Sequence, residues 1–396
     1  MNKFGMFIHW GLYALTEQHE QALARYQIPF DEYETLAKKF NPTEYNPEEW
    51  VLLAKNAGMK YICFTTKHHD GFCMWDTKYT DYNVMNSPYG KDVLKMLADA
   101  CKKHGMLLSL YYSNPDWYHE NAYNENSTHQ WRAKYPEKSD LDAYRTYIKN
   151  QLKELLSNYG EIYTLFWDIP PKVEDPSMNE FVRSLQPNIL INDRGWDAGD
   201  FSTPERSVPD GAHFERMTEA CQSVGEQAWG YRADEDYYSA SFLMSSIDKI
   251  MAMGGSYLLN VGPMPNGKIP EQAIKLIEKV GNWYKRMQDA LENHVADEHN
   301  IALVNNKELV VTYKDGKTYL HLYKGVTSTG INFSLECEFK PKKARLLNSN
   351  TELKIRSALL PHYMAKDGTA KGPFTSITEI PCDDYVGEPL IIELEW

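Results

Sequence analysis

The sequence predicts a parallel α/β fold, a (β/α)8 barrel over residues 1–295, followed by a small antiparallel β-sandwich over residues 300–396. Apolar strands alternate with amphipathic helices for about 290 residues, a pattern and a length that suit such a barrel. Short alternating strands then replace this pattern, as in a sandwich. A doubly wound open sheet is the alternative. However, no G-x-G-x-x-G follows the first strand and no G-x-x-x-x-G-K-[ST] occurs, so nothing supports nucleotide binding.

The expected barrel elements follow one another in a regular order. Short apolar runs that stop at polar residues indicate buried strands, and 3.6-residue periodicity between them indicates covering helices. After a first strand that begins at Phe4, strands are expected at residues 60–66, 106–112, 162–168, 188–194 and 256–261. Helices are expected at residues 29–40, 47–57, 92–100, 141–157, 238–253 and 271–291.

The C-terminal region has the alternation of an antiparallel sheet. Strands are expected at residues 308–313, 318–323, 331–335 and 390–394. The first two are joined by Lys314-Asp315-Gly316-Lys317, and Asp-Gly suits the positive φ angles of a type I′ turn. The polar stretch at residues 292–299 is the expected domain boundary.

Charge and composition exclude several classes of protein. The chain has 42 basic and 55 acidic residues, and the net charge of −13 disfavours nucleic acid or an anionic membrane as a partner. The six cysteines form no C-x-x-C pair, so buried free thiols are expected rather than a zinc ribbon or a redox motif. No signal peptide and no long apolar segment is visible, so a cytoplasmic location is expected. The oligomeric state has no indicator in the sequence.

Polar side chains follow the apolar run of each predicted strand. Because the carboxyl ends of parallel strands meet at one mouth of a barrel, these side chains should line a deep pocket. They are His9, His68, His69, Asp70, Tyr111, Tyr112, Asp168, Asn192, Asp193 and Arg194. The aromatic residues interleaved with them are Trp10, Trp75, Phe166, Trp167 and Trp229. Polar groups mixed with flat apolar faces suit a sugar.

Asp168 is the strongest candidate for a catalytic group. It follows six largely apolar residues, so a rigid strand should hold its carboxylate in the mouth of the barrel. The alternative role is a helix cap or an ion-pair partner. A second carboxylate would complete a glycosidase pair, and Glu205, on an expected loop, is the candidate. Glu219 and Glu215 compete with it.

The triplet His68-His69-Asp70 raises the question of a metal. Adjacent residues on a strand point to opposite faces, so the two histidines are not expected to share an ion unless the chain turns between them. No H-E-x-x-H or H-x-H accompanies them, and neither a metal nor any other cofactor is predicted. We expect neutral imidazoles that hydrogen-bond substrate hydroxyls. A buried histidine satisfied within the core is the alternative.

Six segments together resemble the α-L-fucosidases of glycoside hydrolase family 29. They are FGMFIHWG at 4–11, AGMKYICFTTKHHDGF at 57–72, LLSLYYSNPDW at 107–117, LFWDIP at 165–170, WGY at 229–231 and GGSYLLNVGPMPNG at 254–267. The resemblance implies a retaining mechanism with Asp168 as the nucleophile. It also implies Glu205 as the acid/base, while Glu219 resembles a Trp-Glu-x-Cys segment and is the second choice.

The resemblance also suggests the sugar contacts. His9, His68 and His69 match positions that hydrogen-bond fucose hydroxyls, and Arg194 matches an arginine near the nucleophile. Glu20 resembles the glutamate of a His-Glu-Trp motif, but Gln21 replaces the tryptophan. The remaining expected sugar contacts are Tyr112, Trp167 and Trp229.

The expected partner is a fucosylated oligosaccharide or glycoconjugate. The loss of an aromatic wall at Gln21 leaves another L-sugar as an alternative. Two further alternatives are a sugar-binding pseudoenzyme on the same scaffold and a metal-dependent hydrolase built on His68, His69 and Asp70.

Overall fold

The computed structural model describes residues 1–122, 129, 131–296, 301–304, 308–337, 340–361 and 368–396. The chain divides into two compact units. The first comprises Met1–Ser207, Arg216–Tyr238 and Tyr257–Glu278, and the second comprises Val208–Glu215, Ser239–Ser256 and Lys279–Trp396. The second unit therefore also takes in segments that precede residue 295, and part of the expected boundary lies outside the described residues.

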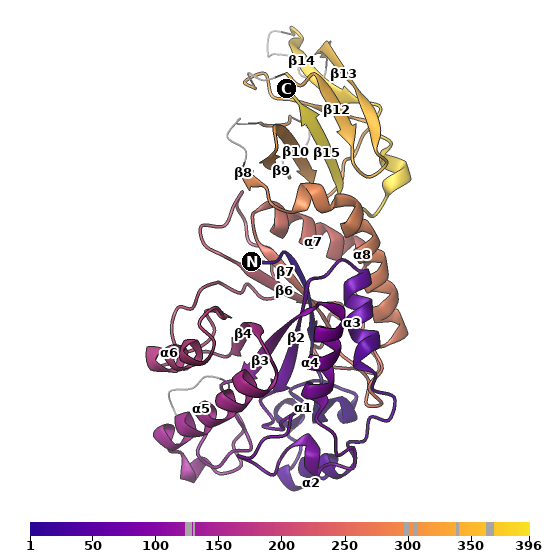
Figure 1. The fold of residues 1–396 in the computed structure, drawn as a ribbon. Coiled ribbons are helices and arrows are strands. Elements are labelled where there is room, and N and C mark those ends of the chain that lie inside the picture. The colour runs from indigo at the N-terminus through magenta and orange to yellow at the C-terminus, as the bar shows by residue number, and fades with distance from the viewer. Residues whose placement is uncertain (123–128, 130, 297–300, 305–307, 338–339, 362–367) are drawn as a thin grey trace. The chain divides into compact units, whose positions relative to one another are not determined.

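The first unit is built on a parallel sheet that curls into a barrel (Figure 1). Its strands lie in the order β5-β4-β3-β2-β1-β7-β6. Their bounds are β1 Phe4–Ile8, β2 Tyr61–Lys67, β3 Leu107–Ser113, β4 Ile162–Asp168, β5 Leu190–Ile191, β6 Glu219–Ser223 and β7 Ser256–Val261. Every residue of β1, β2 and β7 is buried, which is why the sequences of these strands are largely apolar.

Residues 201–205 complete the ring between the two edge strands. Phe201 forms a parallel bridge to Asn192, directly after β5. Ser202 and Glu205 form parallel bridges to Thr218 and to Cys221 of β6. Glu205 lies outside the named strands, as expected of a loop residue, but backbone hydrogen bonds at Pro204 and Arg206 tie this segment to Cys221. The predicted barrel is confirmed, with this segment in the place of an eighth strand.

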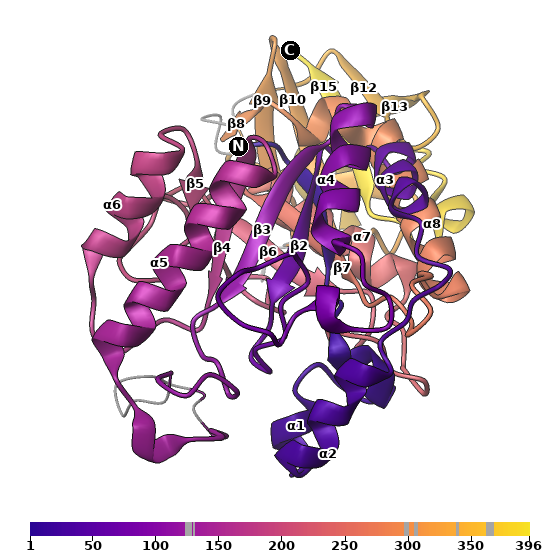
Figure 2. The same cartoon turned by 60° about the horizontal axis from the view of Figure 1, so that its bottom comes forward.

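Helices cover the outer side of the strands (Figure 2). They are α3 Pro47–Asn56, α4 Val93–His104, α5 Leu141–Asn158 and α6 Pro176–Leu185, while the short helices α1 Ala22–Arg25 and α2 Phe30–Glu34 lie beyond the tips of the strands. Side chains of Asn46, Asp92 and Asp140 accept hydrogen bonds from the first turns of α3, α4 and α5, which fixes where these helices begin. The helix α8, Glu271–Leu291, runs from the first unit into the second.

The second unit is an antiparallel sheet in the order β11-β14-β13-β12-β15-β10-β9-β8, together with α7, Ala240–Ala252. The strands are β8 Val295–Ala296, β9 Val310–Lys314, β10 Lys317–Leu322, β11 Gly330–Asn332, β12 Lys343–Leu346, β13 Thr351–Leu360, β14 Lys371–Thr378 and β15 Leu390–Glu395. One apolar core joins β10, β12 and β15 to β11 and β14, as expected of the predicted sandwich. Asp315 and Gly316, between β9 and β10, have φ angles of 52° and 81°, which confirms the predicted turn.

Two further sequence expectations concern the whole chain. All six cysteines are free thiols, and Cys63, Cys73, Cys101 and Cys221 are buried. Among the described helices, none has both the length and the apolar character that crossing a bilayer requires.

Candidate active site

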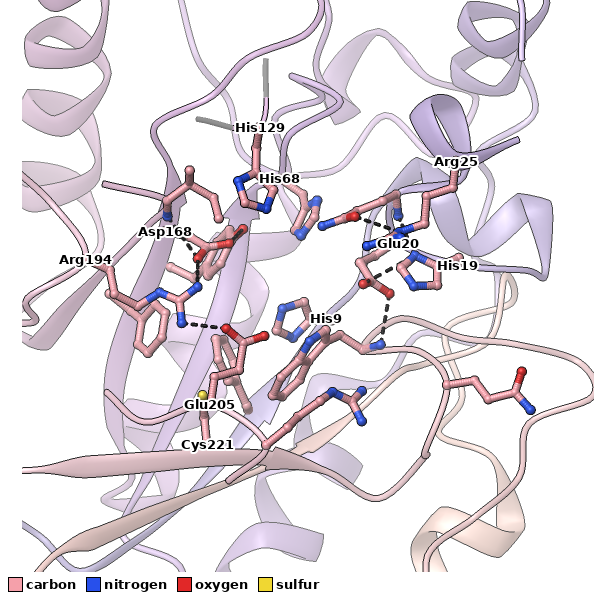
Figure 3. Close-up of a pocket in the computed structure, with 18 of the residues that line it drawn as sticks. His9, His19, Glu20, Arg25, His68, His129, Asp168, Arg194, Glu205 and Cys221 are labelled. Atoms are coloured by element: carbon pink, nitrogen blue, oxygen red, sulfur yellow. Dashed lines mark hydrogen bonds and ion pairs between the residues drawn. The ribbon is translucent and has the colours of Figure 1, made fainter. Parts of the chain in front are cut away.

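A cavity of about 420 Å³ opens at the carboxyl ends of the barrel strands (Figure 3). Ligand pockets are roughly 300–1,000 Å³, so this cavity has the size of a small-molecule site. Its deep part is lined by Phe7, His9, His68, Tyr111, Phe166 and Asp168. The rest of its lining is His19, Glu20, Gln21, Arg25, His129, Ile169, Arg194, Glu205, Arg206, Cys221, Glu226, Gln227 and Trp229.

Arg194 joins the two candidate carboxylates. Its Nη2 donates to Oδ1 of Asp168 at 2.8 Å, and its Nη1 donates to Oε2 of Glu205 at 2.6 Å. The Asp168 side chain is 12% exposed and that of Glu205 is 37% exposed, so the two carboxylates face different degrees of hydration. One buried and one more open carboxylate on the same cation is an arrangement that can divide the roles of nucleophile and proton carrier.

Asp168 is held as an anion. Its Oδ2 accepts a 2.7 Å hydrogen bond from the hydroxyl of Tyr111, and its Oδ1 also accepts from the backbone of Ile169. Burial by itself would raise the pKa of Asp168, but the charge of Arg194 and the Tyr111 hydrogen bond outweigh it, so the pKa lies below its ordinary value. An ionised carboxylate at the end of a rigid strand is suited to nucleophilic attack.

Each carboxylate is followed by a residue in the left-handed region of backbone space. Ile169 has φ 62° and Arg206 has φ 48°. Such a conformation is costly for a β-branched residue such as isoleucine, and strain of this kind gathers at functional sites. The Arg206 guanidinium is fixed by three backbone carbonyls and lies 4.5 Å from the centre of the Trp229 ring.

His9 and Trp229 form one wall of the pocket. Their rings stack with centroids 5.3 Å apart. Asn260 donates through Nδ2 to the Trp229 carbonyl and to Ser223, so its Oδ1 accepts from Nδ1 of His9 at 2.7 Å. The Nε2 of a neutral His9 is then left as an acceptor. Burial lowers the pKa of His9, although Glu20 and the Asn260 hydrogen bond oppose this effect.

Glu20 acts on the pocket through the backbone. It is 2% exposed, and its Oε2 accepts from the amides of Trp229 at 2.9 Å and Gly230 at 3.1 Å. Glu20 therefore positions the wall that carries Trp229.

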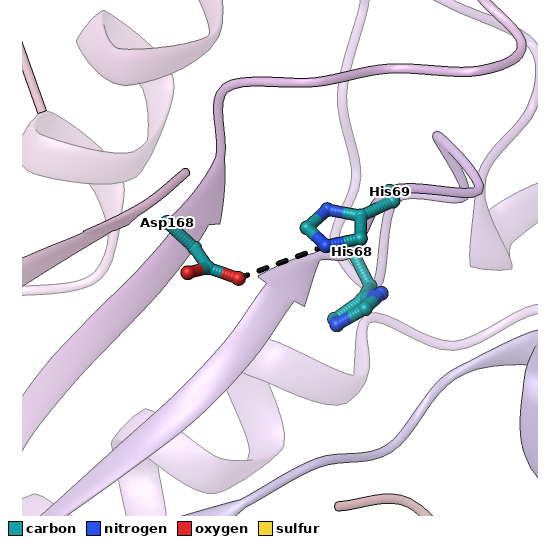
Figure 4. Close-up of side chains that lie close together, drawn as sticks. All are labelled: His68, His69 and Asp168. Carbon is teal, nitrogen blue, oxygen red and sulfur yellow. Dashed lines mark ion pairs between the residues drawn. The ribbon is translucent and has the colours of Figure 1, made fainter. Parts of the chain in front are cut away.

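His68 and His69 lie side by side, because they follow the end of a strand and the chain turns there. The strand β2 ends at Lys67, the chain turns at once, and the two ring centroids are 4.2 Å apart. Both rings are buried, and burial lowers their pKa values well below the ordinary one, assisted by the neighbouring histidines. His68 lines the cavity, whereas His69 contacts Asp168 behind it (Figure 4).

Asp70 does not join the pocket. Its carboxylate accepts from the Tyr33 hydroxyl and the Phe72 backbone, and burial raises its pKa to about 7. A metal-dependent centre built on this residue has no geometric basis.

Two expected sugar contacts are wrong, each by one position along its strand. Tyr112 donates to Gln151 of α5 and lies 4.4 Å under the Lys67 ammonium, on the helix side of the sheet. Trp167 donates to Asn179 of α6 and packs on Gly195. Their neighbours Tyr111 and Phe166 line the cavity instead, since successive residues of a strand face opposite sides.

Glu219 does not lie at the cavity either. It begins β6 and is fully buried, with Oε2 accepting from the hydroxyl of Tyr61 at the start of β2. Burial raises its pKa to about 7. The carboxyl is thus in the barrel interior at the amino-terminal ends of the strands, away from the cavity. Glu215 is exposed and does not line the cavity.

The outer rim contains Gln21, which the sequence marked as a departure from the motif, and Arg25, which the sequence did not single out. Gln21 lines the cavity and accepts from Nε of Arg25 at 2.8 Å. The Arg25 guanidinium lies 5.7 Å from the ring centre of Trp131, whose side chain is 53% exposed. Within the described part of the chain, no acceptor is recorded for the two terminal nitrogens of Arg25. The missing aromatic wall is thus replaced by a hydrogen-bonding rim.

Two carboxylates on one arginine, in a sugar-sized pocket with aromatic walls, at the mouth of a parallel β/α barrel, define the class of this protein as a glycoside hydrolase. The family model described as α-L-fucosidase matches residues 1–289. The chain belongs to the α-L-fucosidase family.

Individual relatives agree with this assignment. The structure of α-L-fucosidase isoenzyme 1 from Paenibacillus thiaminolyticus is 32% identical, covers 99% of this chain and 96% of its own, and has a TM-score of 0.84. The D200A variant of α-L-fucosidase AlfC from Lactobacillus casei, solved in complex with Fuca(1,6)GlcNAc, is 31% identical with a TM-score of 0.66 and covers 73% of this chain and 98% of its own. The putative α-L-fucosidase of Caenorhabditis elegans is 26% identical over 371 residues, which are 85% of this chain and 74% of that protein.

Proposed function

We propose that this pocket hydrolyses terminal α-L-fucosides with retention of configuration, with Asp168 as nucleophile and Glu205 as acid/base. The observation that carries this assignment is Arg194, which binds both carboxylates at once. Retaining enzymes hold the two carboxyl groups roughly 5–5.5 Å apart, and one bridging guanidinium matches so short a separation. Inverting enzymes need room for a water between the groups.

The reaction proceeds in two displacements. In the first, a carboxylate oxygen of Asp168 forms a bond to the anomeric carbon while the glycosidic bond breaks and protonated Glu205 gives its proton to the departing oxygen. In the second, Glu205 takes a proton from water, the water oxygen bonds to the anomeric carbon, and Asp168 leaves as a carboxylate. Esterification removes the negative charge of Asp168, which favours the ionised Glu205 that the second step needs.

The deep pocket suits a monosaccharide with both hydroxyl and apolar groups. His9 and His68 offer imidazole nitrogens for hydroxyls, while Trp229 and Phe166 offer ring faces for C–H groups and for the methyl of a 6-deoxy sugar. His69 lies behind His68, with its Nε2 3.7 Å from Oδ2 of Asp168.

We assign the leaving group to the outer rim. Glu205 faces this side, and Gln21, Arg25 and Gln227 present hydrogen-bonding groups there. A polar leaving group such as a second sugar of an oligosaccharide or glycoconjugate fits this rim. For AlfC the solved complex contains Fuca(1,6)GlcNAc, which supports a saccharide in this place.

The test is hydrolysis of an aryl α-L-fucoside by the wild type, Asp168→Ala and Glu205→Ala. We expect the Asp168 variant to lose activity by a factor of about 10⁴ or more, because a nucleophile is removed. With azide, Asp168→Ala should yield β-fucosyl azide and Glu205→Ala α-fucosyl azide. An Asp168 variant that keeps most of its activity would disprove the assignment. Fucose binding by an inactive wild type would instead identify a pseudoenzyme.

A further inference from the structure

An electron pair of His69 faces a carboxylate oxygen of Asp168. The Ser113 hydroxyl donates to the carbonyl of Pro115 at 2.6 Å, so at its 2.6 Å contact with Nδ1 of His69 it must accept. A neutral His69 therefore carries its proton on Nδ1 and leaves Nε2 bare. That nitrogen lies 3.7 Å from Oδ2 of Asp168. Nε2 of His69 and Oδ2 of Asp168 are thus both hydrogen-bond acceptors, and no hydrogen atom lies between them.

His68 brings a third electron-pair donor to the same point. Its ring centroid lies 4.2 Å from that of His69, and its Nδ1 is buried with no hydrogen-bond partner among the residues that the structure describes. One ligand atom from each of His68, His69 and Asp168 falls within 4.8 Å of the other two (Figure 4). The three donors come from two segments, the turn after β2 and the tip of β4.

We propose that His68, His69 and Asp168 form a binding site for a divalent transition-metal ion such as Zn²⁺, and that the bound ion inhibits the enzyme. The inhibitory consequence rests on the proposed function, because the ion would occupy the electron pairs with which Asp168 attacks the sugar. The binding itself does not depend on the proposed function.

The distances and the donor types favour this class of ion. Zinc bonds of about 2.0–2.2 Å place tetrahedral ligands roughly 3.3–3.6 Å apart, so the His69 and Asp168 atoms are already nearly at coordination distance. The His68 atom lies within 4.8 Å of the other two, so a side-chain rotation can bring it to coordination distance. Two imidazoles and one carboxylate select Zn²⁺, Co²⁺, Ni²⁺ or Cu²⁺ over Mg²⁺ and Ca²⁺.

Neighbouring groups both support and limit the site. Ser113 fixes the ring orientation of His69, as the hydrogen-bond partners of metal-binding histidines do. Arg194 opposes the ion, since its cation lies 2.8 Å from the other oxygen of Asp168. We therefore expect a dissociation constant of about 10 µM rather than the far tighter binding of structural zinc sites.

Binding is measured first, without reference to catalysis. Chelator-treated protein is titrated with Co²⁺, and visible absorption of the bound ion should appear with one equivalent. His68→Ala should abolish it, and Asp168→Asn, which keeps the shape of the side chain, should weaken binding at least tenfold. His129→Ala is the matched control, because this histidine lines the cavity but stands outside the three-residue group, its ring 6.3 Å from that of His69. It should bind Co²⁺ as the wild type does.

Inhibition is measured second, on an aryl α-L-fucoside. At about 100 µM Zn²⁺, a 10 µM site raises KM about elevenfold with kcat unchanged. A chelator should restore activity, and Mg²⁺ at the same concentration should have no effect.

The two measurements separate the two proposals. Co²⁺ binding that survives in both His68→Ala and Asp168→Asn overturns the metal site, as does Zn²⁺ inhibition that is not competitive with the substrate. Neither result affects the fucosidase assignment. An inactive wild type that still binds Co²⁺ through His68 and Asp168 overturns the catalytic proposal and leaves the site intact.

Discussion

The hydroxyl of Tyr111 donates a 2.7 Å hydrogen bond to Oδ2 of Asp168. The two residues lie near the ends of the neighbouring parallel strands β3 and β4. Burial raises the pKa of Tyr111, followed by the effect of the Asp168 charge, so the phenol stays a donor. Because the hydrogen bond favours the ionised carboxylate, it lowers the pH down to which Asp168 stays ionised.

Tyr111→Phe should therefore lower kcat/KM and move the acid limb of its pH profile to higher pH. One hydrogen bond to a charged group contributes about 1.5–3 kcal/mol, which corresponds to a loss of roughly 10- to 150-fold. The direction of the pH shift follows because the Tyr111 hydrogen bond lowers the pKa of Asp168. The measurement is a pH–rate profile on an aryl fucoside.

Tyr112→Phe is the matched control. Tyr112 loses its hydrogen bond to Gln151 on the other side of the sheet, so its effect should appear in thermal stability, with kcat/KM within about twofold of the wild type. A shifted acid limb in Tyr112→Phe, and not in Tyr111→Phe, would contradict the assignment of Tyr111 to the pocket side of β3.

Glu20→Ala should raise KM more than it lowers kcat. The change leaves the Trp229 and Gly230 amides without their acceptor, and each unsatisfied buried donor costs about 1–3 kcal/mol. We expect the Trp229 wall to loosen and KM to rise about tenfold or more. Glu20→Gln keeps an accepting oxygen in the same place and should recover most of the loss. Equal KM values for the two variants would contradict this positioning role.

Arg25→Ala should lower kcat/KM on a fucosylated disaccharide more than on an aryl fucoside. The terminal nitrogens of Arg25 face the rim assigned to the leaving group, so kcat/KM on a fucosylated disaccharide should fall about 5- to 10-fold, the effect of a lost hydrogen bond. Hydrolysis of an aryl fucoside with a small leaving group should change little. Gln21→Ala, which releases the Nε anchor of Arg25, should give a weaker effect of the same kind. Equal losses of kcat/KM on both substrates would show that Arg25 contacts the fucose and not the leaving group.

Glu219→Gln should change how stability depends on pH. The folded protein holds a proton on Glu219 up to about pH 7, whereas the ordinary value is 4.5. Between these values the folded state binds more protons than the unfolded state, so stability falls as pH rises from about 4.5 to about 7 and is constant above. The amide carries no such proton, and the full shift corresponds to about 3 kcal/mol.

The midpoint of thermal unfolding should show this difference. Compared with the wild type, Glu219→Gln should gain stability progressively between pH 5 and about pH 7. Asp70→Asn, at a second buried carboxyl with a pKa of about 7, tests whether the effect is additive. A constant difference between wild type and Glu219→Gln at every pH would show that Glu219 does not titrate in this range.

The apolar pattern of the sequence predicted those barrel strands that are buried on both faces. The strands β1, β2, β4 and β7 are largely apolar, and the apolar pattern alone located them within a residue or two. It missed β6, whose sequence Glu-Ala-Cys-Gln-Ser has no apolar run although all five residues are buried. Polar side chains there are satisfied by partners distant in the chain, such as Tyr61 for Glu219, and no local pattern encodes such partners.

By itself, the sequence determined which chemical groups are available and that strand ends deliver them to one pocket. His9, His68, Asp168, Arg194 and Glu205 were all named from their positions after apolar runs or from family motifs, and the structure places all of them at the cavity. The sequence also marked Gln21 as a departure, without showing that it anchors Arg25.

Only the tertiary structure decided which neighbour of a pair faces the pocket. Tyr111 and Phe166 replaced Tyr112 and Trp167, because adjacent residues of a strand face opposite sides and both members of each pair are aromatic. Local sequence alone does not determine which one lies inward. In the same way, the turn after Lys67 brought His68 and His69 together against Asp168. The direction of a side chain depends on where a strand stops and what packs behind it, and those contacts come from the folded chain.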